Sequence, residues 1–99
     1  LYPNPLGLTG ADRVSFLYTL SKDASTRLEV YDSSGKLIYQ KYFVSGGPGG
    51  RFGPNSDITW DGTNMAGEKA SSGVYFCYII ASDETGNAKA TSRKLLIIR

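Results

Sequence analysis

Two neighbouring stretches decide the fold of this chain: Trp60–Gly67, with the sequence WDGTNMAG, and Ser72–Phe76, with the sequence SGVYF. They predict a short strand that ends at the tryptophan, two tight turns and a second strand. Gly62, Asn64 and Gly67 are the residue types that adopt a positive φ at low cost, as such a reversal requires. The tryptophan at the end of the first strand is the largest candidate for the core. A strand–turn–turn–strand unit of this kind is typical of an all-β fold.

Through most of the remaining chain, apolar and polar residues alternate, which is the pattern of β-strands with one buried face. Residues 45–54 hold five Gly and two Pro, which predicts a mobile loop with little structure of its own. The run Val74–Ala81 is uncharged, which favours a central strand buried on both faces. Seven strands and no helical period predict an antiparallel β-sandwich. The expected strands are Leu1–Pro5 (an edge segment), Val14–Leu20, Arg27–Asp32, Leu37–Phe43, Asp57–Trp60, Val74–Ala81 and Ala88–Arg99.

Length and composition exclude several classes of protein. Ninety-nine residues suit one domain, residues 1–99, and the start at Leu1 favours a piece of a longer or processed protein. A net charge of +2 argues against a nucleic-acid partner, and no apolar run reaches the length of a membrane span. The chain has no His and a single Cys, Cys77, so no internal disulfide, zinc cluster or cysteine–histidine pair can form. We therefore expect no enzyme activity and no cofactor.

Short motifs follow one another in a fixed order: Tyr2–Pro5, Phe16-x-Tyr18-x-Leu20, Leu28–Gly35, the WDG turn, Ser72–Tyr75 and Lys94–Arg99. Together they resemble two related groups of bacterial modules. One is the Ig-like module of the flagellar hook-capping protein FlgD, and the other is the "YPNP" C-terminal module of secreted proteins, including type IX sorting tails. The resemblance implies an Ig-like or fibronectin III-like sandwich at the C-terminal end of a longer protein. It also implies an extracellular or cell-surface location reached through the periplasm, and a role in sorting, attachment or structure.

The turn residues admit structural and binding interpretations. Trp60 with Asp61 and Asn64 could form a sugar-stacking platform, but core packing and side chain-to-backbone bonds explain the same residues. Asp61, Asn64 and Glu68 could also hold calcium, although they lack the dense alternating spacing of a dedicated loop. We favour structure over binding here. The residues assigned a structural role are Trp60, Asp61, Gly62, Asn64, Gly67, Gly73 and Tyr75.

Tyr75 precedes Cys77 by two residues, the position of the tyrosine corner of Ig sandwiches, where the hydroxyl bonds to nearby backbone. Cys77, within an apolar run, is expected to be a small buried hydrophobe. Tyr31, Tyr39 and Tyr42 fall in one predicted hairpin and could form a tyrosine-lined binding face, but strands are rich in tyrosine in any case.

The last predicted strand carries four basic residues and no acidic one: Lys89, Arg93, Lys94 and Arg99. Basic side chains protect a sheet edge against unwanted pairing. They could equally contact an acidic partner, either a protein of the export or surface machinery or a surface glycan. The alternative functions are therefore a carbohydrate-binding or adhesion module of a secreted enzyme, and a structural spacer or assembly subunit.

Overall fold

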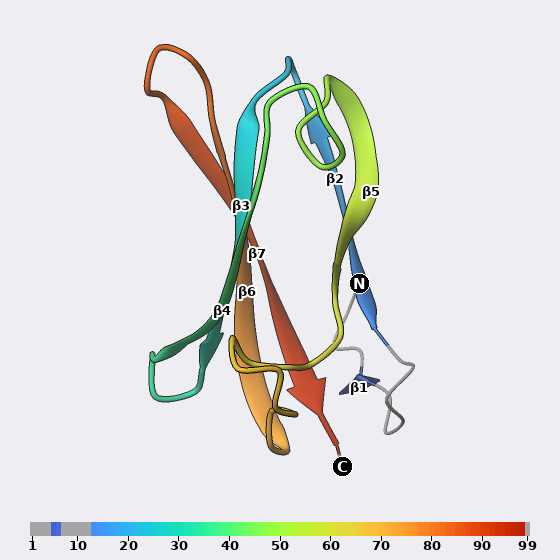
Figure 1. The fold of residues 1–99 in the computed structure, drawn as a ribbon, viewed down its shortest axis with the longest axis vertical. Coiled ribbons are helices and arrows are strands. Elements are labelled where there is room, and N and C mark those ends of the chain that lie inside the picture. The colour runs from blue at the N-terminus through green and yellow to red at the C-terminus, as the bar shows by residue number, and fades with distance from the viewer. Residues whose placement is uncertain (1–4, 7–12, 99) are drawn as a thin grey trace.

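The computed structural model describes residues 5–6 and 13–98 of the chain, and these form strands and turns without any helix (Figure 1). Six strands have seven to ten residues, and the first has only two. The strands are β1 (Pro5–Leu6), β2 (Val14–Leu20), β3 (Ser25–Asp32), β4 (Leu37–Phe43), β5 (Gly53–Trp60), β6 (Gly73–Ser82) and β7 (Ala88–Ile97).

The strands form two sheets that face each other (Figure 1). The larger sheet has the order β1-β7-β6-β3-β4, and the smaller contains β2 and β5. All neighbours are antiparallel except β1, which runs parallel to β7 and pairs only at Leu96 and Ile97. The predicted all-β, Ig-like sandwich is confirmed, with one short parallel pair added at the edge.

The core lies between the sheets and is built from alternate residues of five strands. The central strand pair contributes Leu28 and Val30 from β3 with Cys77 and Ile79 from β6, all at most 4% exposed. Alternation along each strand sends every second side chain inward, which explains why the sequence repeats with a period of two. The other buried apolar residues of this cluster are Val14, Phe16, Ile58, Trp60, Ala70, Tyr75, Leu95 and Ile97.

β6 is central, as predicted, but its predicted burial on both faces is wrong. Tyr75, Cys77 and Ile79 are buried, whereas Phe76 and Tyr78 on the opposite face are only partly buried. The smaller sheet covers only one face of the larger one, so the outer face of β6 keeps contact with solvent. A run of apolar residues alone could not reveal this, because outward aromatic side chains look the same in sequence as buried ones.

The glycine-rich segment between β4 and β5 is a compact set of turns, so the prediction of little internal structure is wrong. Its Gly49 carbonyl accepts hydrogen bonds from the hydroxyls of Thr26 and Tyr18. The Gly50 carbonyl accepts the amides of Ala24 (3.1 Å) and Gly46 (2.8 Å). A Cβ atom on Gly50 would lie within 2.5 Å of two backbone oxygens, so the close approach of three segments requires glycine there.

β5 also begins at Gly53, four residues earlier than predicted, because Gly53, Pro54 and Asn55 pair with the end of β2. Pro54 is tolerated because β5 is the edge strand of a two-stranded sheet.

Three turns share one construction, built on Asp32, Asn64 and Asp83. In each, a side-chain oxygen accepts the backbone amides two and four residues later, at 2.9–3.1 Å. A glycine with φ between 82° and 88° follows three residues after each. The expected positive φ at Asn64 is wrong: every positive φ among the described residues belongs to glycine, and Asn64 acts through its side chain instead.

Candidate functional site

The WDG turn is held by the side chains that were assigned a structural role. Trp60 is 1% exposed, and its indole Nε1 donates to the carbonyl oxygen of Thr63 at 2.8 Å. Asp61 Oδ1 accepts the Thr63 amide (3.2 Å) and hydroxyl (2.6 Å). Gly62 and Gly67 have φ of 83° and 82°. The tryptophan is therefore a core anchor whose only polar atom is satisfied inside the turn.

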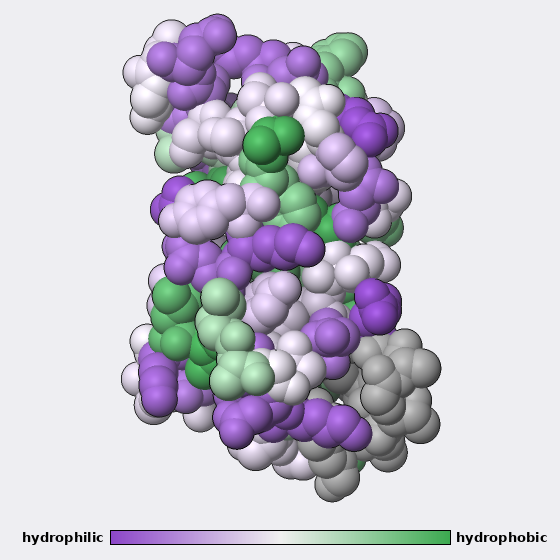
Figure 2. Space-filling view, viewed as in Figure 1, coloured by the Kyte–Doolittle hydropathy of each residue, from purple (hydrophilic) through white to green (hydrophobic). Residues whose placement is uncertain are grey.

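The second half of this turn covers one edge of the larger sheet. The Met65 amide donates to the carbonyl of Ile38 at 3.0 Å, and the Gln40 amide lies 3.2 Å from Met65 Sδ. Both contacts fall on β4, the last strand of the sheet. The face in Figure 2 is mostly hydrophilic, but hydrophobic side chains gather near β4, where Leu37 and Met65 are 40% and 68% exposed. The turn therefore shields part of an edge that could otherwise pair with another strand.

Neither ligand hypothesis for the turn matches this geometry. Trp60 is buried, so its ring offers no face on which a sugar could stack. Asn64 Oδ1 accepts two backbone amides, and Asn64 Nδ2 donates to Glu68 Oε1 at 3.1 Å. One side-chain oxygen of each of the three candidate ligands, Asp61, Asn64 and Glu68, is thus already engaged by hydrogen-bond donors of the turn. No group of three or more acidic, histidine or cysteine side chains suited to a metal occurs in the described part of the chain.

Tyr75 makes the contact expected of a tyrosine corner. Its hydroxyl donates to the carbonyl oxygen of Ser71, four residues earlier, at 2.7 Å. The ring is 5% exposed and lies 5.8 Å from the Trp60 ring, centroid to centroid. Gly73 begins β6 in the short segment between these partners. The hydrogen bond fixes the entry of β6 next to the WDG turn.

Cys77 is buried in the same strand and has the character of a small hydrophobe. It is a free thiol, 1% exposed, and burial raises its pKa to about 12. The thiolate, which is the nucleophile and metal ligand, is thus scarcely populated at neutral pH.

The three tyrosines of the β3–β4 hairpin do not form one binding face. Tyr39 packs toward the core, with its ring 6.4 Å from that of Trp60. Tyr31 lies on the outer face of the sheet, where its hydroxyl donates to Glu29 and its ring meets Tyr78 edge-on at 5.6 Å. Tyr42 is 70% exposed and opposite Arg27 on β3. The hypothesis of a binding surface shared by all three, over which the structural explanation was favoured, therefore does not hold for Tyr39.

The outer aromatic face was not predicted from the sequence, because the apolar run of β6 favoured burial of its outward residues as well. A shallow cavity of about 420 Å³ lies there, lined in part by Tyr31, Phe76, Tyr78 and Ile80. The Tyr31 and Tyr78 rings are 84° apart, so this pair does not offer the coplanar platform that stacks on a sugar.

The basic residues of the last strand lie near the edge of the larger sheet. β7 is the last full-length strand on its side, and the described residues place only the two-residue β1 beyond it. Lys89 and Lys94 are exposed, and Arg93 is partly buried with hydrogen bonds to Thr91 Oγ1 and the Ser92 carbonyl. Arg99, the fourth basic residue, lies outside the described residues. The strand thus presents cationic side chains at an accessible edge.

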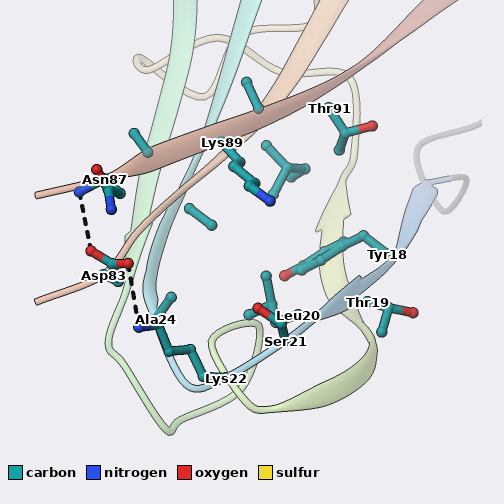
Figure 3. A pocket seen from close by; sticks show the side chains of 14 residues that line it. Tyr18, Thr19, Leu20, Ser21, Lys22, Ala24, Asp83, Asn87, Lys89 and Thr91 are labelled. Carbon is teal, nitrogen blue, oxygen red and sulfur yellow. Dashed lines mark hydrogen bonds and ion pairs between the residues drawn. The ribbon is translucent and has the colours of Figure 1, made fainter. Parts of the chain in front are cut away.

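A groove separates this edge from β2 in the opposite sheet. Its cavity of about 700 Å³ is lined by Tyr18–Lys22 on one side and by Ala88–Thr91 on the other, with Ile79 and Ala81 between them. Figure 3 shows Tyr18 and Lys89 pointing into the space from opposite walls. Lys22 and Asp83 form an ion pair at 3.4 Å at one end. Ile79 and Ala81 give the groove an apolar floor, and the ammonium of Lys89 at its wall has no ion pair or hydrogen bond with another described residue.

Three features define an Ig-like β-sandwich module: two facing sheets, the short β1 strand parallel to β7, and the hydrogen bond from Tyr75 to Ser71 near the start of β6. The chain belongs to the FlgD Ig-like domain family, whose profile matches residues 4–85. No curated protein matches it by sequence. Within the described residues, no helix is long and apolar enough to cross a membrane.

Solved structures share the fold at low sequence identity. FlgD from Pseudomonas aeruginosa (TM-score 0.69, 19% identity) matches over 90% of this chain and 65% of its own. FlgD from Xanthomonas campestris, whose structure is described as giving insights into the hook capping essential for flagellar assembly, has a TM-score of 0.69 and 17% identity. It matches over 94% of this chain and 64% of its own. Dimeric latent PorU from Porphyromonas gingivalis has a TM-score of 0.67 and 20% identity, and it matches over 99% of this chain but only 9% of its own. The chain therefore spans less than two thirds of each of these proteins.

Proposed function

We propose that this chain is a non-catalytic module at the C-terminal end of a secreted bacterial protein, where it serves export recognition and surface attachment. The observation that carries the proposal is the position of the basic strand. β7 places Lys89, Arg93 and Lys94 along an accessible edge of a hydrogen-bonded sheet. A rigid array of like charges raises the rate of encounter with an acidic partner and favours one orientation.

The known proteins support this proposal in part. Sandwiches of this family occur within FlgD, a protein of flagellar assembly, and the same fold covers a small share of PorU. In both, the module is one part of a longer chain. That context favours a role in recognition and assembly for the present chain as well.

The test is an export assay with charge-neutralised modules. The module is fused to a periplasmic reporter in a bacterium with type IX secretion, and Lys89, Arg93, Lys94 and Arg99 are changed to Gln. We expect the reporter to stay in the periplasm. Removal of residues 94–99 is a poorer test, because it also deletes Leu95 and Ile97, which are at most 1% exposed and belong to the core.

The matched control changes four basic residues elsewhere on the surface to Gln: Arg13, Lys36, Lys41 and Lys69, all exposed. It alters the net charge by the same amount. Circular dichroism and thermal unfolding establish that both variants fold. Equal export of both variants and the wild type would reject the signal role of β7, and export without the module would reject sorting altogether.

A further inference from the structure

The place beside β7 in the larger sheet is filled at one end only. β1 pairs with Leu96 and Ile97, while Ala88–Leu95 have no strand partner on that side among the described residues. In the opposite sheet, β2 pairs with β5 alone among the described strands, so no described strand occupies the edge of β2 that faces the groove. Unpaired edges are templates for an added strand. Six residues of such a strand would span about 20 Å.

The groove next to this edge is suited to alternate side chains of an added strand. Its floor is apolar, with Ile79 and the small Ala81 from β6. Its far wall is Tyr18, whose hydroxyl is fixed by the Gly49 carbonyl. A separate hollow of about 10 Å³, lined by Phe16, Cys77 and Arg93 among others, has room for about one water molecule and not for a side chain. The small Ala81 on the floor and the fixed aromatic wall leave room for incoming side chains.

The charges along this side are positive and largely unneutralised. Lys89 has no hydrogen bond or ion pair with any described residue, and Figure 3 shows it pointing into the cavity. Residues 89, 91 and 93 share one face of β7, because side chains alternate along a strand, so Arg93 points the same way. The acid at the rim, Asp83, is already engaged by Lys22, Thr85 and Asn87. Charge complementarity therefore selects an acidic occupant.

We propose that β7 binds an extended acidic segment of a partner protein as an additional strand, alongside Ala88–Arg93. Acidic side chains of the segment lie toward Lys89 and Arg93, and apolar side chains between them face away or cover the small residues of β7. Backbone bonds supply the register and the two cations select the partner. This inference rests on the proposed function, because it names the kind of partner that a recognition module of this kind would bind.

The probe is an acetylated and amidated heptapeptide of alternating Glu and Val, titrated into the 15N-labelled 99-residue chain. We expect chemical-shift changes along Ala88–Arg93 and slower amide exchange there. The same peptide with Lys in place of Glu should not bind. Two further peptides, one N-methylated at its Val residues and the other at its Glu residues, separate strand pairing from simple charge attraction. In a strand, the amides of alternate residues point to the same edge, and only one edge of the peptide can pair with β7. Only one of the two methylated peptides should therefore lose binding.

Variants locate the site. Lys89→Gln and Arg93→Gln should each weaken binding by about two- to fivefold, the range expected for one exposed charge pair. Lys41→Gln, on β4 at the far side of the sheet, removes the same charge and should leave the affinity unchanged. Failure to bind at low salt, shifts confined to another surface, or equal binding of both N-methylated peptides would overturn the proposal. So would concentration-dependent dimerisation through β7, which would make a second copy the occupant.

The outcomes separate this inference from the proposed function. Peptide binding without any effect of the basic residues on export would leave the groove intact as a site and reject the export role. Dependence of export on the same residues without peptide binding would mean that the export machinery recognises the charges without strand addition.

Discussion

Replacing Tyr75 with Phe tests whether the tyrosine corner contributes to stability. The substitution removes one hydroxyl and keeps the ring, which is 5% exposed and packs against Trp60. The lost interaction is the 2.7 Å hydrogen bond to the Ser71 carbonyl. Ser71 is exposed, so water can reach the carbonyl that loses its donor. The cost is therefore that of one net hydrogen bond, about 0.5–1.5 kcal/mol, and not that of a buried unsatisfied group.

Urea unfolding followed by the fluorescence of the single tryptophan measures this difference. With a slope of about 1–3 kcal/mol per molar urea for a small domain, a loss of about 1 kcal/mol lowers the midpoint by about 0.3–1 M. Tyr78→Phe is the matched control, because Tyr78 lies on the outer face of the same strand and its hydroxyl has no hydrogen bond among the described residues. Its midpoint should stay within error of the wild type.

Two results would refute the reasoning. An unchanged midpoint for Tyr75→Phe would show that the hydroxyl gains nothing from Ser71 relative to water. Equal losses in both variants would show that the effect belongs to tyrosine in a strand and not to the corner. A change in the slope would point to an altered denatured state and would require a second probe.

Three further outcomes follow from the core and the turns. Trp60→Ala should cost about 3–5 kcal/mol, and native wild-type fluorescence should be blue-shifted and protected from acrylamide; a solvent-like spectrum would contradict its burial. Hydrogen bonds to the Asp83 carboxylate, above all that from the Thr85 hydroxyl, lower its pKa to about 2. The ionised carboxylate therefore contributes to stability above about pH 5, and this contribution is lost as the pH falls toward 2. Asp83→Asn should fold, because Asn64 makes the same turn, but with a flatter acid limb in unfolding titrations. Cys77 should resist a thiol reagent at pH 8 until the chain is denatured, and fast labelling of the native protein would contradict its raised pKa.

The sandwich can be predicted from the amino-acid sequence because short-range rules set the strands and turns from which it is built. Alternation places Leu28 and Val30 inward whatever the topology, and the turn at Asp32 follows from one carboxylate and a glycine three residues later. The roles of Trp60 and the bond of Tyr75 also depend on near neighbours, Thr63 and Ser71. Partners three or four residues apart leave a readable pattern in the chain.

The tertiary structure alone decided which surfaces are free. Whether Phe76 and Tyr78 are core or surface depends on how far the second sheet extends, and two strands cover only one face of five. The conformation of the glycine-rich turns depends on hydrogen bonds from the hydroxyls of Tyr18 and Thr26 to the Gly49 carbonyl, more than twenty residues away in the chain. The groove at Lys89 arises from the packing of β2 opposite β7, residues about seventy apart in the chain. Contacts between such distant segments are set by packing, which no local pattern of residues encodes.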